Sequence, residues 1–157
     1  MEAAPRSALN QEALTVLKLL QRQAGHYRKL RELSKQQAEL IRDQQAERLL
    51  GVLGERQGHV EALTNLSRQL EPLRPRLTSI TATAPAALRD GIRAATEEVK
   101  ALLSEIIRRD RDDQARLQEQ QDQVRTEIRG LQPRRAAVNA YGGAPVAPGR
   151  PLTRHSA

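Results

Sequence analysis

Residues 88–106, with the sequence LRDGIRAATEEVKALLSEI, decide the fold class of this chain. Their apolar side chains recur at alternating steps of four and three residues, at Leu88, Ile92, Ala95, Val99, Leu102 and Ile106. This spacing places the side chains on one face of a helix, and that face needs another helix to cover it. The stretch therefore predicts an α-helix that belongs to a helical bundle.

Two more segments nearer the start of the chain show helical spacing. The first stripe follows the same steps through Ala13, Val16, Leu20, Gln23, Tyr27 and Leu30, and the second segment carries Leu49, Leu50, Leu53, Val60, Leu63, Leu66 and Leu70. Asp43 lies between them and is a candidate N-cap for the second helix. No Gly or Pro marks a turn there, so a kinked continuous helix stays an alternative. A hairpin of helices at about 8–42 and 44–71 is favoured, because a single rod would leave both stripes exposed.

Prolines mark the next boundary. Pro72 and Pro75 are expected to end the second helix, since proline removes a backbone donor and disfavours helix in the residue before it. The small, polar and β-branched residues 78–85, TSITATAP, predict a linker over 72–85. Pro85 fits the first turn of a third helix.

The third helix is expected to span about 86–131 and to end before Pro133. The predicted architecture is all-α: a long antiparallel hairpin and a long third helix form a coiled-coil-like bundle over 8–131. The remaining residues, 132–157, are rich in Pro, Gly and Arg. They predict a flexible, disordered tail.

The stripe of the third helix changes after Ile106. A strict heptad would place Arg109 and Asp113 inward, which is unfavourable in an apolar core. The segment 108–113, RRDRDD, is therefore interpreted as a solvated face whose charges neutralise one another, rather than as a cation site. Apolar residues resume on a part of the helix that should extend past the hairpin. We expect partner binding by Leu117, Val124, Ile128 and Leu131, with Val138 and Tyr141 continuing the apolar trace into the tail.

The residue types exclude most catalytic chemistry. The 157 residues include no Cys, Phe or Trp and two Tyr, so disulfides and thiolate zinc sites are excluded. No nucleotide-binding or metalloprotease motif occurs among them. His26 and His59 should lie at a similar level of the hairpin, but two imidazoles without a third ligand make a poor metal site. The sequence predicts a protein that is no enzyme and has no catalytic, cofactor-binding or metal site.

Glycines at 51, 54 and 58 leave two interpretations open. Small residues at this spacing can permit the close approach of another helix. In a soluble helix they can equally just lower its stability.

Charge and hydropathy bear on partners and location. The net charge is +7, but residues 132–157 contain four Arg and no Asp or Glu, so the tail supplies +4 of it. The helical segments are nearly balanced, which argues against a nucleic-acid partner. No basic and apolar leader is present, and no apolar run approaches the roughly 18 residues of a membrane span. We expect a cytoplasmic protein.

The chain resembles the FlgN family of flagellar type III export chaperones. The similar segments are Ile41-Arg-Asp43 followed by LLGVL at 49–53 and VEAL at 60–63, then LLSEIIRRDRDDQ at 102–114 and AYGG at 140–143. The first three lie within a longer similar stretch from Leu17 to Leu70, and the resemblance covers most of residues 10–143. The chain departs from the family pattern at Asp110, where relatives often have Asn, and in its Arg-rich tail.

This resemblance implies a cytoplasmic chaperone that holds hook-associated proteins, those of the hook–filament junction, before secretion. It also implies that the C-terminal helix binds the cargo. Components of the export apparatus are candidate further partners, and the free chain is expected to be a monomer or weak dimer. The alternative is a homo-oligomeric coiled-coil scaffold or adaptor, because two copies could cover the same exposed stripe.

Overall fold

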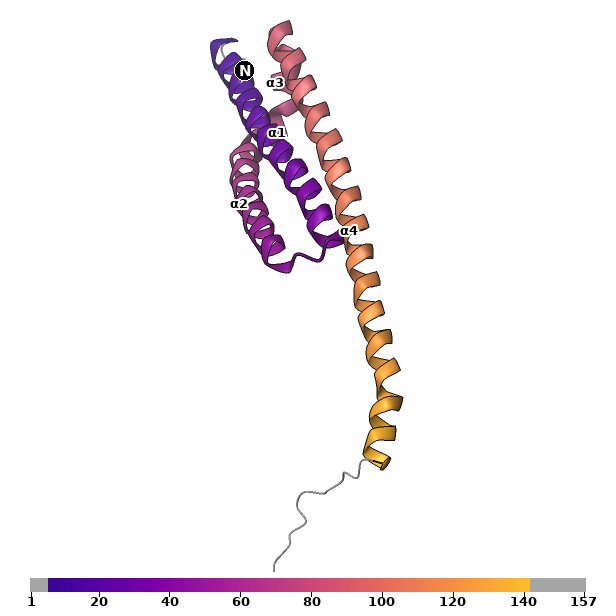
Figure 1. Ribbon diagram of the computed structural model, residues 1–157. Coiled ribbons are helices and arrows are strands. Elements are labelled where there is room, and N and C mark those ends of the chain that lie inside the picture. The colour runs from indigo at the N-terminus through magenta and orange to yellow at the C-terminus, as the bar shows by residue number, and fades with distance from the viewer. Residues whose placement is uncertain (1–5, 142–157) are drawn as a thin grey trace, which may run out of the picture. The chain divides into compact units, whose positions relative to one another are not determined.

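The computed structural model describes residues 6–141, with side chains for residues 6–131, and in this range the chain is helical with no strand. Its elements are α1 (Arg6–Arg42), α2 (Ala46–Leu70), the 3-10 helix η1 (Glu71–Arg76), α3 (Leu77–Thr83) and α4 (Ala86–Tyr141) (Figure 1). The all-α prediction is confirmed. Among these residues no helix combines the length and the apolar character that a membrane span requires.

The chain divides at Gln114 into two compact units, and α4 contributes residues to both. Unit 1 contains α1, α2, η1, α3 and α4 as far as Gln114. Unit 2 begins at Ala115 and contains the remainder of α4.

Helices α1 and α2 form the predicted antiparallel hairpin, and a tight turn joins them (Figure 1). Gln44 has a φ of 54° in this turn, and the N–H of Gln45 donates to the carbonyl of Leu40 at 2.9 Å. The N-cap of α2 is Gln45, whose side chain makes no capping hydrogen bond. The expectation that Asp43 caps α2 is wrong, because the turn needs two more residues before the helix can begin.

The core of unit 1 follows the three predicted stripes. One apolar cluster joins Val16 of α1, Leu66 and Leu70 of α2, and Ile92 of α4, and a second joins Leu30, Leu63, Ile106 and the partly buried Tyr27. Each cluster contains residues of α1, α2 and α4, so the hairpin and the first half of α4 cover one another's apolar faces.

The expected linker at 72–85 is instead mostly helical. Pro72 lies at the start of η1, where a missing N–H costs little. Ile80 of α3 is fully buried in the first apolar cluster, and the hydroxyl of Thr83 donates to the carbonyl of Ser79 at 2.8 Å. Burial of Ile80 therefore overrides the weak helix propensity of the β-branched residues around it.

Helix α4 continues past its expected end at 131 to Tyr141. Pro133 does not end it, although proline removes one backbone hydrogen bond and its ring crowds the carbonyl of the residue four positions earlier. Residues 132–141 of the expected tail are therefore helical. Residues 142–157 lie outside the described residues.

Candidate functional site

A polar cluster lies where the buried apolar face of α4 ends. It consists of Ser34 and Gln37 of α1, Arg56 of α2, and Asp110 and Asp113 of α4. Arg56 donates to Ser34 Oγ and to Asp110 Oδ2, both at 2.8 Å. Gln37 Nε2 donates to Asp113 Oδ2 at 2.8 Å. The cluster thus links three helices through side chains.

The expectation that residues 108–113 form a solvated face is wrong for Asp113. Asp113 is only 5% exposed, and Asp110 binds a largely buried Arg56. The heptad positions of α4 continue inward as far as Asp113, because α1 and α2 offer hydrogen-bond partners at that level. A buried carboxylate is tolerated where such partners exist.

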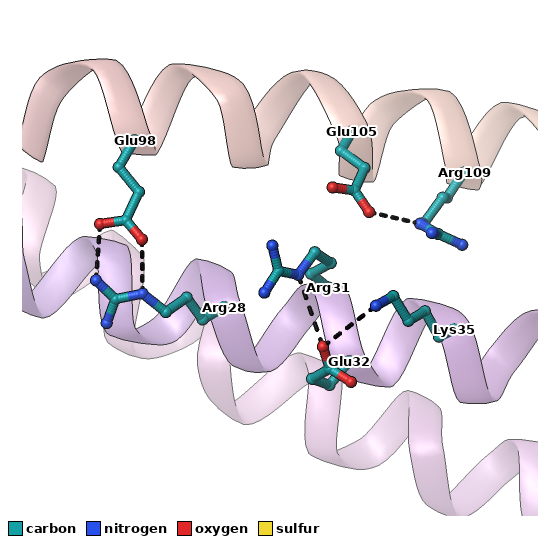
Figure 2. Close-up of polar contacts among 7 residues, drawn as sticks. All are labelled: Arg28, Arg31, Glu32, Lys35, Glu98, Glu105 and Arg109. Carbon is teal, nitrogen blue, oxygen red and sulfur yellow. Dashed lines mark hydrogen bonds and ion pairs between the residues drawn. The ribbon is translucent and has the colours of Figure 1, made fainter.

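Charged side chains line the boundary between α1 and α4 (Figure 2). Arg28 Nε and Nη2 each donate to a carboxylate oxygen of Glu98 at 2.7 Å, and this hydrogen bonding lowers the pKa of Glu98. Arg109 Nε donates to Glu105 at 2.9 Å and lowers the pKa of Glu105 in the same way. Exposed pairs of this kind contribute little to stability. Of the two pairs, Arg28–Glu98 joins α1 to α4, and its geometry favours one alignment of these helices.

The hairpin brings His26 and His59 together, as the sequence predicts. Their Nδ1 atoms lie 2.9 Å apart, so one ring donates and the other accepts. Burial, and then the neighbouring His59, lower the pKa of His26. Among the described residues no group of three His, Cys, Asp or Glu side chains could hold a metal ion.

In unit 2, the described apolar side chains form one exposed face, here called the apolar stripe. It comprises Leu117, Val124, Ile128 and Leu131, which are 44%, 53%, 53% and 47% exposed. At 100° per residue their positions fall within about 60° of one another around the helix. The backbone of Val138 and Tyr141 belongs to α4, while their side chains lie outside the described part of the chain.

Sequence reasoning missed the polar cluster. Asp110 and Asp113 are spaced by three residues and continue the steps from Ile106, which is the signal that could have identified an inward face. The sequence of α4 alone does not reveal which residues of α1 and α2 pair with these two carboxylates.

These features define a helical protein with a covered seam at one part of a long helix and an exposed apolar face at another, an arrangement typical of proteins that bind other helices. The family model described as "FlgN protein" matches residues 13–146. This is most of the chain, and the protein belongs to the FlgN family. Membership supports a general role as a chaperone of flagellar export. Searches of curated proteins and of solved structures give no match.

Proposed function

We propose that the protein is a cytoplasmic, non-enzymatic export chaperone that binds flagellar hook-associated proteins before type III secretion. Membership in the FlgN family supports the class of function. The proposed location of the binding site rests on the apolar stripe of unit 2, whose side chains are about half exposed. An amphipathic helix of the cargo is the complementary surface.

The energetics set a minimum size for the contact. Burying the exposed half of each stripe residue gains roughly 1 kcal/mol, so the stripe alone supplies roughly 4 kcal/mol. That free energy corresponds to a dissociation constant of about 1 mM. A working chaperone needs more contact area, which favours extension of the site to Val138 and Tyr141 at the end of α4.

The test is a triple variant, Leu117→Ser, Val124→Ser and Ile128→Ser, titrated calorimetrically with purified hook-associated proteins of the same cell. Loss of the stripe should abolish measurable binding. The matched control is Glu119→Ser, Thr126→Ser and Arg129→Ser, which alters other faces of the same helix and leaves the net charge unchanged. The control should bind cargo like the wild type.

Urea unfolding of both variants separates binding from folding. If the stripe variant unfolds globally, those residues are core and the cargo site lies elsewhere. If it binds cargo at wild-type affinity, the proposed site is wrong.

A homo-oligomeric scaffold is the alternative use of the same stripe. Sedimentation equilibrium over a wide concentration range distinguishes the two functions. The chaperone should stay a monomer or weak dimer, whereas a scaffold should self-associate strongly and lose that association in the stripe variant.

A further inference from the structure

A cleft of about 650 Å³ opens in unit 1 among α1, η1, α3 and the first turns of α4. Its volume is within the range of ligand-binding pockets. Apolar side chains from four helices form most of its walls: Val16, Leu20, Leu70, Leu77 and Ile92.

One polar side chain of α1 offers a free amide to the cleft. Gln23 of α1 lines the cleft and is only 8% exposed. Among the described residues its amide makes no hydrogen bond. Its amide nitrogen and oxygen are not among the fully buried atoms without a partner, so they are accessible from the cleft, where they can donate and accept a hydrogen bond. The N–H and C=O of a peptide bond are complementary to it.

The charge of the cleft is positive. Half-buried Arg89 of α4 lines it and has no ion pair within residues 6–131. Arg74 lies at the rim, with Glu71 as an exposed partner at 3.5 Å. No acidic side chain lines the cleft. A bound group that brings its own carboxylate would pair with Arg89.

We propose that this cleft binds a short segment of a partner protein in which apolar side chains lie next to a carboxylate. The apolar walls take the side chains, Gln23 pairs with the peptide backbone and Arg89 with the carboxylate. A fatty acid would leave the Gln23 amide unpaired. The C-terminal segment 132–157 of this chain has four Arg and no acid, so its charge opposes binding at Arg89.

This site is separate from the proposed cargo site. Its lining residues lie between Val16 and Thr96, all in unit 1, and none belongs to the apolar stripe. The proposal therefore does not rest on the proposed function, and the triple stripe variant should keep the cleft intact.

The experiment selects peptides of about 12 residues from a randomised displayed library on the full chain. The enriched sequences should share apolar residues beside Asp, Glu or the terminal carboxylate. Labelled synthetic copies of them are then measured by fluorescence anisotropy against variants of the chain.

Two substitutions with matched controls report on the cleft. Gln23→Leu replaces an amide that makes no hydrogen bond to another described residue with an apolar group of similar size, so the fold should persist, while peptide affinity should fall about tenfold. Gln21→Leu, on the exposed side of the same helix, should change nothing. Arg89→Glu should weaken binding by more than tenfold, whereas Arg93→Glu, exposed one turn further along α4, should have a much smaller, salt-screened effect.

Several results would overturn the proposal. These are an absence of enriched peptides, enrichment of sequences without an acidic group, and equal affinity of wild type, Gln23→Leu and Arg89→Glu. Loss of binding in the triple stripe variant would place the peptides on unit 2 and contradict it as well. Self-association of the chain that Arg89→Glu abolishes would identify a second copy as the occupant instead.

Discussion

Helix α4 carries apolar residues at helical spacing in two regions that differ in burial. Between residues 92 and 106 the side chains of Ile92, Leu102 and Ile106 are buried, and Ile92 and Ile106 belong to apolar clusters with residues of α1 and α2. Between 117 and 131 the apolar stripe is about half exposed. The comparison teaches that periodicity identifies which face of a helix is apolar, while the partner of that face depends on the rest of the molecule.

The largest expected effect comes from making the same substitution, Leu to Ala, once in each of the two regions. Leu102→Ala removes a 4% exposed side chain and should lower the free energy of unfolding by about 2–5 kcal/mol. Leu131→Ala removes one that is 47% exposed and should change it by less than about 0.5 kcal/mol. Urea unfolding followed by circular dichroism measures both. Equal losses would mean that the stripe is also core.

A second pair tests whether the covered region extends to the polar cluster. Gln37→Leu removes the donor to buried Asp113 and should cost about 1–3 kcal/mol of unfolding free energy. Gln36→Leu, on the exposed side of α1, should stay within about 0.5 kcal/mol of the wild type. If both variants have wild-type stability, the seam ends before Asp113.

Two glycines contrast an open face with a packed one. A Cβ at Gly51 of α2 would meet no atom within 4 Å, whereas at Gly91 of α4 it would lie 3.2 Å from Leu17 Cδ1 and Cδ2. Gly51→Ala should therefore stabilise the chain by up to about 1 kcal/mol. Gly91→Ala should gain less, because Leu17 must move. Thermal unfolding of the two variants gives the order, and a larger gain at Gly91 would contradict the close packing of α1 on α4.

The smallest expected effect is a pH dependence in the hairpin. His26 titrates below the ordinary pKa of 6.5 in the folded chain, so below pH 6.5 the unfolded chain binds more protons and acid favours unfolding. Stability should fall slightly as the pH drops from 7 through 6.5 towards 5. His26→Asn should reduce this slope in urea titrations at several pH values, and an unchanged slope would assign it to other groups.

The sequence predicted the hairpin and the seam through Ile106, because these depend on local periodicity and on the need to cover an apolar face. Helix α3 was missed, since the burial of Ile80 depends on contacts that residues 77–83 alone do not encode. The same limit applied to Asp113, whose polar partner is on α1. The three glycines of α2 were ambiguous from sequence. At each of them a Cβ would meet no atom within 4 Å, so no helix of the described residues packs closely on these glycines.

Four exposed residues of the candidate site, at 117, 124, 128 and 131, followed from the sequence pattern, since nothing apolar was available to pair with them. The cleft around Gln23 could not be predicted. Its walls come from α1, α2, η1, α3 and α4, and only the fold shows that the amide is open to a cleft lined mostly by apolar side chains.

Hydrogen–deuterium exchange of the full chain, with and without a purified hook-associated protein, tests the central claim most directly. Amides of residues 92–113 should be protected in both samples, because that part of α4 is packed in unit 1. Amides of residues 117–131 should exchange quickly in the free chain, where the helix has an uncovered apolar face, and slowly once cargo is bound. Protection of 117–131 in the free monomer, or no change there in a complex that does form, would contradict the account.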